Sequence, residues 1–397
     1  MLAKTPPMGW NSWNTFGVDI NETVIMEMAD VIVEKGYKDV GYEYVVIDDG
    51  WSSMNRDADG NLVADPQKFP NGIKFLADYI HGKGLKFGIY SCAGVKTCGG
   101  YPGSGGHEYE DARLFAEWGV DFLKYDFCYF PENGNAMSAY LTMSMALKAS
   151  GREILFSACN WGVGEPWKWM RSIGAHMYRT TGDIFDSYKS YRDIILSQQD
   201  NWCMSAPGCY NDPDMLVIGM YGNGYAGIEN GCTDVEYESH FAWWCFTGAP
   251  LMIGGDIRTL SPFCEKLLKN KLLISIDQDE ESRPPFMVGE TRKLQDGRVF
   301  VKHLSKNRFA IGFFKEENES RTLLFDLRDA GIPYQTGLTL DLTDAMTGEH
   351  VGIIDQDSYY CKLPEHGCKI YIAEFANRKD SQSNLQTDKI FWNVAVD

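Results

Sequence analysis

Residues 44–48, Tyr-Val-Val-Ile-Asp, decide the fold class that the sequence predicts. This run of aromatic and β-branched residues is typical of a buried strand. A helical pattern follows over residues 72–80 and stops at Gly82, and residues 85–90 (Leu-Lys-Phe-Gly-Ile-Tyr) form the next apolar run. A strand, a helix and a second strand in this order predict a parallel sheet with right-handed crossovers.

The same alternation extends in both directions from this unit. Helices are also expected over residues 108–118 and 136–149, and strands at 8–11, 121–125, 154–157, near 177–178, near 209–211 and at 250–253. Eight strands separated by helices predict a (β/α)8 TIM barrel over residues 1–285. An open doubly wound sheet fits less well, because no glycine-rich phosphate turn follows the first strand.

The pattern changes after Pro284 and Pro285. Short β-type runs separated by turn residues follow at 299–301, 309–314, 322–325 and 369–373. They predict an antiparallel β-sandwich over residues 286–376. Residues 377–397 are polar, and we expect them to form a loose tail.

The composition excludes several classes of partner. The 397 residues include 37 Lys and Arg against 55 Asp and Glu, a net charge of −18. A polyanion does not attract phosphate backbones or anionic lipids, so we expect neither a nucleic-acid nor a membrane partner. No apolar run is long enough for a transmembrane helix.

The N-terminus and the cysteines bear on the compartment. The first residues lack the apolar segment of a signal peptide, which favours the cytoplasm; secretion stays open if a signal has been removed. The 11 cysteines include no CxxC pair. We therefore expect buried thiols with at most one local bridge, rather than a zinc ribbon or a disulfide scaffold.

Aspartates follow four of the predicted strands. They are Asp48 and Asp49, Asp126, Asp183, and the pair Asp212 and Asp214. One aspartate after a strand is most often a helix cap or a turn residue. Four such places on the C-terminal rim of one barrel indicate an active site.

Two chemistries fit a rim of carboxylates. The first is a divalent metal site in an isomerase or aldolase, since Mg²⁺ and Mn²⁺ prefer oxygen ligands. The seven histidines form no HxH or HxxxH pair; we expect no metal and no cofactor, and a metal-dependent isomerase or aldolase stays open as an alternative. The second chemistry is a glycosidase that uses two carboxylates.

The neighbours of two aspartates favour the glycosidase. Asp126 lies two residues after Lys124, so both side chains point to the same side of the strand, and an ammonium there lowers the pKa of a nucleophilic carboxylate. Asp183 lies four residues after Arg179 in a loop, a polar setting that suits an acid/base group. Trp10, Trp13, Trp51 and Trp161 lie near the same strand ends, where aromatic faces would suit a pyranose.

These motifs together resemble a known family. Residues 4–13 (Lys-Thr-Pro-Pro-Met-Gly-Trp-Asn-Ser-Trp), 47–51 (Ile-Asp-Asp-Gly-Trp), 124–128 (Lys-Tyr-Asp-Phe-Cys) and 211–216 (Asn-Asp-Pro-Asp-Met-Leu) are similar to the α-galactosidases, or melibiases, of glycoside hydrolase family 27 in clan D. The resemblance extends over about residues 3–279, in order and at family-like spacing. It implies a (β/α)8 barrel followed by a β-sandwich, and hydrolysis of terminal α-linked galactose with retention of configuration and without a metal.

The resemblance also implies roles for single residues. Asp126 would be the nucleophile and Asp183 the acid/base. Asp48 and Asp49 would hold the 4- and 6-hydroxyls, and so select galactose. The other residues implied in substrate binding are Trp13, Tyr90, Cys98, Lys124, Cys159, Asn160, Trp161, Arg179 and Met215. Cys98 and Cys128 match a family disulfide, although both could equally be thiols in the cytoplasm.

Alternatives within and outside the family remain. Asn160 and Trp161 supply bulk where the family's α-N-acetylgalactosaminidases have small residues, which favours galactose. A β-L-arabinopyranosidase is left open, although the intact Asp48-Asp49 pair speaks for galactose. A non-catalytic galactose-binding protein is the alternative from another class. The partner expected is a small-molecule or oligosaccharide α-galactoside, and a homo-oligomer is left open.

Overall fold

The computed structural model describes residues 2–289, 297–316 and 322–378, and the chain forms two compact units. The first unit comprises Met1–Trp244 and Ala249–Lys269, and the second comprises Cys245–Gly248 and Asn270–Asp397. These units are defined by contacts, so the domain boundary at residue 285 stays a prediction. Of the predicted tail, residues 379–397 lie outside the described residues.

The first unit contains an eight-stranded parallel sheet in the order β7-β6-β5-β4-β3-β2-β1-β8. Its strands are β1 (Met8–Asn11), β2 (Tyr44–Val46), β3 (Lys86–Cys92), β4 (Phe122–Asp126), β5 (Leu155–Ala158), β6 (Met177–Arg179), β7 (Tyr210–Asp212) and β8 (Leu251–Ile253). A single bridge between Leu216 and Ile253 joins the segment after β7 to β8 and closes the ring. The predicted barrel is confirmed.

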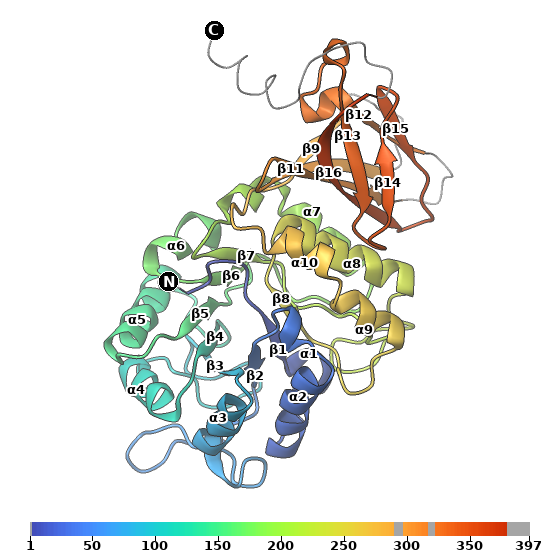
Figure 1. Ribbon diagram of the computed structural model, residues 1–397. Coiled ribbons are helices and arrows are strands. Elements are labelled where there is room, and N and C mark those ends of the chain that lie inside the picture. Colours follow the sequence, from blue (N-terminus) through green and yellow to red (C-terminus); the bar gives the residue numbers. More distant parts are fainter. Residues whose placement is uncertain (1, 290–296, 317–321, 379–397) are drawn as a thin grey trace. The chain divides into compact units, whose positions relative to one another are not determined.

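Helices surround these strands (Figure 1). They are α1 (Trp13–Phe16), α2 (Glu22–Glu34), α3 (Gly72–Gly82), α4 (Glu108–Trp118), α5 (Ala136–Ala149), α6 (Met170–Ile173), α7 (Tyr188–Ser197), α8 (Asp234–Thr247) and α9 (Pro262–Leu268). Local signals set their ends: the Asn21 side chain caps α2, that of Asn135 caps α5, and Gly119 ends α4 in the left-handed conformation.

The barrel interior is filled by side chains from alternate positions on several strands. One apolar cluster takes Tyr44 from β2, Phe122 from β4, Leu155 from β5, Met177 from β6 and Met252 from β8. Side chains of this size leave no channel through the ring, so the barrel is a packed core with space for a ligand only at an end.

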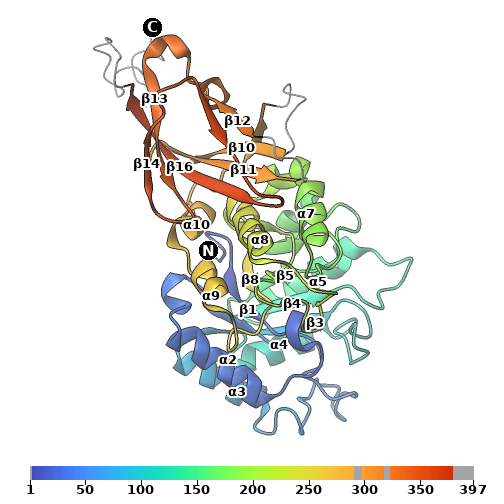
Figure 2. The same cartoon turned by 90° about the vertical axis from the view of Figure 1, so that its right-hand side faces the viewer.

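The second unit is an antiparallel sandwich, as predicted. A six-stranded sheet has the order β14-β13-β16-β11-β10-β9, of which Figure 2 shows β14 to β10. Strand β12 pairs with β15 (Figure 1). Its elements are α10 (Lys271–Asp277), β9 (Phe286–Val288), β10 (Gly297–Leu304), β11 (Arg308–Lys315), β12 (Leu323–Asp326), β13 (Leu338–Asp344), β14 (His350–Ile353), β15 (Ser358–Cys361) and β16 (Cys368–Asn377). Val299, Phe313, Phe325, Leu340 and Tyr371 belong to the core between the two sheets.

The cysteines follow the expected pattern: Cys98 and Cys128 form a disulfide, and eight of the nine free cysteines are buried. Among the described residues, no helix has the length and apolarity that crossing a bilayer would require.

Strands β1 and β2 pack closely at Gly9, and a substitution there tests this packing. A Cβ at this position would lie 2.5 Å from the Tyr44 carbonyl oxygen and 2.7 Å from the Tyr44 Cβ. We expect Gly9→Ala to lower the free energy of unfolding by about 1–3 kcal/mol, because two backbones must move apart. Urea denaturation measures this loss.

The control is Gly82→Ala at the end of α3, where a Cβ meets nothing within 4 Å. The stability of this variant should be unchanged or higher by about 0.5–1 kcal/mol. Equal stability of wild type and Gly9→Ala would contradict the packing argument.

Candidate active site

A cavity of about 410 Å³ lies at the C-terminal ends of the barrel strands. Ten of the thirteen predicted site residues line it: Trp13, Asp48, Tyr90, Cys98, Lys124, Asp126, Trp161, Arg179, Asp183 and Met215. Asp49, Cys159 and Asn160 are buried and are not among the residues that line it. The cavity has the size of a small-ligand site.

An ion pair joins the ends of β2 and β4. Lys124 Nζ donates to Asp48 Oδ2 at 2.8 Å, and Asn11 Nδ2 donates to the same oxygen at 2.8 Å. Burial acts to lower the pKa of Lys124, but the charges of Asp48, Cys159 and Asp126 and the hydrogen bond to Asp48 together outweigh it and leave the pKa above its ordinary value. Lys124 also lies 5.3 Å from the centre of the Tyr90 ring. The ammonium is therefore held charged and in one position.

Asp126 ends β4 with its carboxylate buried in the cavity wall. The backbone N–H of Phe127 donates to Asp126 Oδ1 at 2.8 Å. Burial raises the pKa of Asp126 to about 6, although the Lys124 ammonium acts in the opposite direction. The expectation that Lys124 lowers the pKa of Asp126 is therefore wrong in its net direction, because desolvation, which disfavours the charged form, is the larger effect.

Asp183 is much more exposed to solvent than Asp126. Its side chain is 57% exposed, and Arg179 Nη2 donates to its Oδ1 at 2.9 Å. Burial acts to raise the pKa of Asp183, but the charges of Arg179 and Lys124 and the hydrogen bond from Arg179 outweigh it, so the pKa is lowered. Two carboxylates in one cavity thus have pKa values shifted in opposite directions, a pattern expected of acid/base sites.

The loops after β3 and β4 are tied together beside the cavity. The disulfide between Cys98 and Cys128 links them, and Tyr90 Oη donates to Cys98 Sγ at 3.4 Å. A Cβ at Gly94 would lie 2.0 Å from the Cys128 carbonyl oxygen, so only glycine allows this approach. Asp49 accepts hydrogen bonds from Gly99 N at 2.6 Å and Gly50 N at 2.8 Å. Asp49 therefore supports the loop that carries Cys98.

The loop after β5 is arranged differently from the expectation. Asn160 Nδ2 donates to the Val163 carbonyl oxygen at 2.6 Å, which turns the side chain back into its own loop. Trp161 lines the cavity with φ of 55°, and Gly162 follows where a Cβ would lie 2.3 Å from the Thr180 carbonyl oxygen. Cys159 Sγ accepts from Arg179 Nη1 at 3.6 Å. Of the two residues expected to supply bulk, Trp161 alone is among those that line the cavity.

Asn11, Phe185 and Tyr225 were not among the predicted site residues, and Asp214 was predicted only as one of the aspartates after the strands, without a role. Asn11 accepts from Trp13 N at 2.8 Å while it donates to Asp48, and Asp214 forms an ion pair with Arg179 at 2.9 Å. Asn11 is the last residue of β1 and Asp214 follows the end of β7, so their position in the sequence was a usable signal. Phe185 and Tyr225 line the cavity from long loops, and no periodicity marks such positions.

Two of the four tryptophans that were expected to face a sugar lie in the core instead. Trp10 and Trp51 are buried and do not line the cavity, with indole N–H groups that donate to the carbonyl oxygens of Gly255 and Tyr90. Within the described part of the chain, one group has metal-ligand spacing, namely Cys98, Asp126 and Cys128. Its two sulfurs are joined to each other, so they offer no thiolate ligand.

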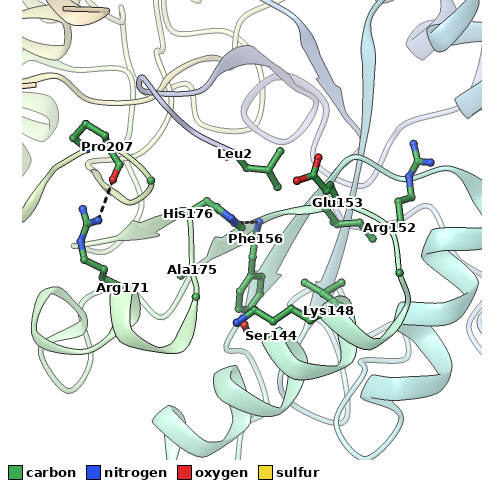
Figure 3. A pocket seen from close by; sticks show the side chains of 15 residues that line it. Leu2, Ser144, Lys148, Arg152, Glu153, Phe156, Arg171, Ala175, His176 and Pro207 are labelled. Atoms are coloured by element: carbon green, nitrogen blue, oxygen red, sulfur yellow. Dashed lines mark hydrogen bonds between the residues drawn. The ribbon is translucent and has the colours of Figure 1, made fainter. Parts of the chain in front are cut away.

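A larger cavity of about 600 Å³ lies at the opposite ends of β5 and β6 (Figure 3). His176 Nδ1 there accepts from Phe156 N at 2.9 Å. Lys148, Glu153 and Arg171 are exposed around it. None of the predicted site residues lines this second cavity.

Comparison with known proteins agrees with the geometry. The sequence profile of a family described as Alpha galactosidase A (Melibiase_2) matches residues 5–279. An α-galactosidase of Cyamopsis tetragonoloba is 42% identical over 374 residues, which cover 94% of this chain and 86% of that protein. The crystal structure of α-galactosidase I from Mortierella vinacea superposes with a TM-score of 0.87 at 30% identity, covering 95% of this chain and 99% of that one.

A third similar structure contains a sugar. It is the α-galactosidase of Saccharomyces cerevisiae with raffinose, with a TM-score of 0.84 and 28% identity, covering 94% of this chain and 98% of that one. The fold and a cavity lined by paired carboxylates define a glycoside hydrolase. The chain belongs to the α-galactosidases of glycoside hydrolase family 27.

The opposite pKa shifts predict a pH profile. A two-carboxylate glycosidase needs one group protonated and one ionised. The pair holds a single proton between the lowered pKa of Asp183 and about 6, the pKa of Asp126, and in the free site this proton is favoured on Asp126. We expect kcat/KM for an aryl α-galactoside to be highest between these limits and to fall as the pH rises above about 6. Initial rates between pH 3.5 and pH 8 measure this. A plateau that continues beyond pH 7 would contradict the assignment.

Proposed function

We propose that the chain removes terminal α-galactosyl residues by two displacements, with Asp126 as the nucleophile and Asp183 as the acid/base. One observation carries the proposal: the two carboxylates line the same cavity, one buried near a lysine and the other half-exposed and bonded to an arginine. Different environments allow two aspartates to play two roles.

In the first displacement, the Asp126 carboxylate attacks the anomeric carbon of the galactoside. The bond from that carbon to the leaving oxygen breaks, and Asp183 gives its proton to this oxygen. The product is a galactosyl ester of Asp126 and a free alcohol. Lys124, held by Asp48, neutralises part of the charge around Asp126.

In the second displacement, Asp183 accepts a proton from water, and the water oxygen attacks the same carbon. The ester bond breaks and the Asp126 carboxylate leaves, so galactose is released with its original configuration. Substrate would cover the exposed part of Asp183 when it enters. This loss of solvent raises the pKa of Asp183, and the carboxyl can then carry the proton that the first step needs.

The ion pair between Lys124 and Asp48 is the proposed recognition site for galactose. Asp48 already accepts from Asn11, Lys124 and its own neighbour Asp49 N, which fixes the orientation of the carboxylate. Lys124 has ammonium protons left after its bond to Asp48. A sugar with hydroxyls placed to bond these groups is favoured, because a sugar that lacks one leaves a buried polar group unsatisfied.

The cavity mouth supports an oligosaccharide as the substrate. Phe185 and Tyr225 line the cavity, yet they are 48% and 63% exposed. The Tyr225 ring lies 4.8 Å from that of Trp13. Exposed aromatic faces next to a sugar site can stack on the apolar side of a second sugar. The structure of the related yeast enzyme is one with raffinose, so we propose that a second sugar unit binds against Phe185 and Tyr225.

Azide distinguishes the roles of the two aspartates. In Asp183→Ala, azide replaces water at the galactosyl ester, so an activated aryl α-galactoside should give α-galactosyl azide. In Asp126→Ala, azide attacks the substrate directly and should give β-galactosyl azide. We expect each variant alone to lose at least about 10²-fold in kcat on raffinose. Proton NMR of the products measures the configuration, and exchanged products would reverse the assignment.

Shortening the aromatic residues tests the oligosaccharide site. We expect Tyr225→Ala to raise KM for raffinose by up to about tenfold, since a stacked ring contributes about 0.5–1.5 kcal/mol to binding. KM for methyl α-galactoside, which has no second sugar, should change less than about twofold. The matched control is Tyr109→Ala, at an exposed tyrosine on α4 that does not line the cavity. Equal effects on both substrates would show that Tyr225 does not contact a second sugar.

A further inference from the structure

Asp214 is held more tightly than its position after β7 requires. Met215 N donates to its Oδ1 at 2.8 Å, Ile184 N donates to its Oδ2 at 2.9 Å, and Trp244 Nε1 donates to its carbonyl oxygen at 2.8 Å. Its φ of 83° lies in the left-handed region, which costs a residue other than glycine conformational energy. A strained, fully bonded aspartate in the cavity wall indicates a functional constraint.

The Asp214 carboxylate reaches Asp183 by two routes. Through Ile184 N it fixes the backbone of the residue directly after Asp183. Through Arg179 it shares a cation with Asp183, because Arg179 Nη2 lies 2.9 Å from an oxygen of each carboxylate. Both the position and the charge of the proposed acid/base group therefore depend on Asp214.

Arg179 needs a counter-ion at every stage of the reaction. Its side chain is 3% exposed, and an unpaired charge in such a place is costly. Asp183 can balance this charge only while it is ionised. When Asp183 carries the proton for the leaving group, the buried carboxylate of Asp214 remains beside the guanidinium. Asp212, at the end of β7, also faces Arg179. Burial raises the pKa of both aspartates, and the Arg179 charge acts against this rise.

We propose that Asp214 is a positioning residue that serves as the permanent counter-ion of Arg179, which leaves Asp183 free to take up and release a proton. The inference rests on the proposed roles of Asp126 and Asp183 and adds a third carboxylate to them. Asp214 acts through Arg179 and through the backbone at Ile184, not by attack or proton transfer.

The charges around Asp183 give the sign of the expected effect. Arg179 faces it from β6, Lys124 from β4, and Asp214 from the segment after β7. Without the Asp214 charge the two cations remain, so they lower the pKa of Asp183 further. The carboxyl is then protonated less often at the pH optimum and is a poorer source of the proton for the leaving oxygen.

The test compares Asp214→Asn with wild type in the full chain. We expect the acidic limb of the kcat/KM profile to move to lower pH by about half a unit or more. We expect kcat/KM for raffinose, whose sugar leaving group needs the proton, to fall at least about tenfold. Activity on 2,4-dinitrophenyl α-galactoside, whose leaving group needs no proton, should fall less than about threefold.

Asp186→Asn is the matched control. Asp186 is also a buried aspartate in the loop after β6, but it accepts from Gly222 N at 2.7 Å and Tyr237 Oη at 3.0 Å. The Asp186→Asn substitution should lower the melting temperature. It should leave unchanged both the acidic limb of the kcat/KM profile and the ratio of activities on raffinose and the dinitrophenyl galactoside. Asp214→Glu retains the charge, so its acidic limb and substrate ratio should match those of wild type even where strain lowers its activity.

Each result decides between explanations. An unmoved acidic limb with equal losses on both substrates in Asp214→Asn would overturn the inference and leave the proposed function intact. If the Asn variant does not fold, an altered substrate ratio in Asp214→Glu would overturn it instead. A wild-type chain that turns over neither substrate would overturn the proposed function itself.

Discussion

The buried ion pair between Lys124 and Asp48 is the interaction on which the site depends. It connects strands that are not neighbours, since β3 lies between β2 and β4. Removing both charges from water costs several kcal/mol for each ion, so the pair persists only where further hydrogen bonds compensate. Asn11 supplies one of these bonds, and it also fixes Trp13. The opening strand, the ion pair and one wall of the cavity therefore form a single constraint, and a change in one member disturbs the others.

The remaining electrostatics divide the cavity into two regions. Around Asp126, desolvation is the larger effect and a neutral carboxyl is favoured; around Asp183, two cations are the larger effect and the charged form is favoured. Two aspartates in one cavity thus have different pKa values. In the free site the proton is therefore favoured on Asp126, whereas the proposed roles need it on Asp183. Substrate entry makes this shift by covering the exposed part of the Asp183 carboxylate.

The sequence predicted the parts of this structure that depend on local pattern. Helices at 108–118 and 136–149 match α4 and α5, and the aspartates at strand ends meet at one cavity because parallel strands end on one side. Burial could not be predicted from the sequence. The lysine beside Asp126 was predicted correctly, but the desolvation of the Asp126 carboxylate was not. Phe185 and Tyr225 come from loops with no period, and the orientation of Asn160 depends on a bond within its own loop. Such features depend on tertiary packing, which spacing does not encode.

The closure of the ring by one bridge at Leu216 has a mechanical consequence. Every other pair of neighbouring strands shares at least two registered residues, whereas this seam has one. Backbone amides on either side of the seam should therefore exchange with solvent sooner than those of β3 and β4, since fewer bonds must break to expose them. Asp214 and Met215 lie directly before Leu216, so the side of the barrel that orients Arg179 is also the side with the least resistance to opening. The wall around Lys124 thus rests on the long ladder between β3 and β4, whereas the wall around Arg179 depends on the hydrogen bonds and the ion pair of Asp214.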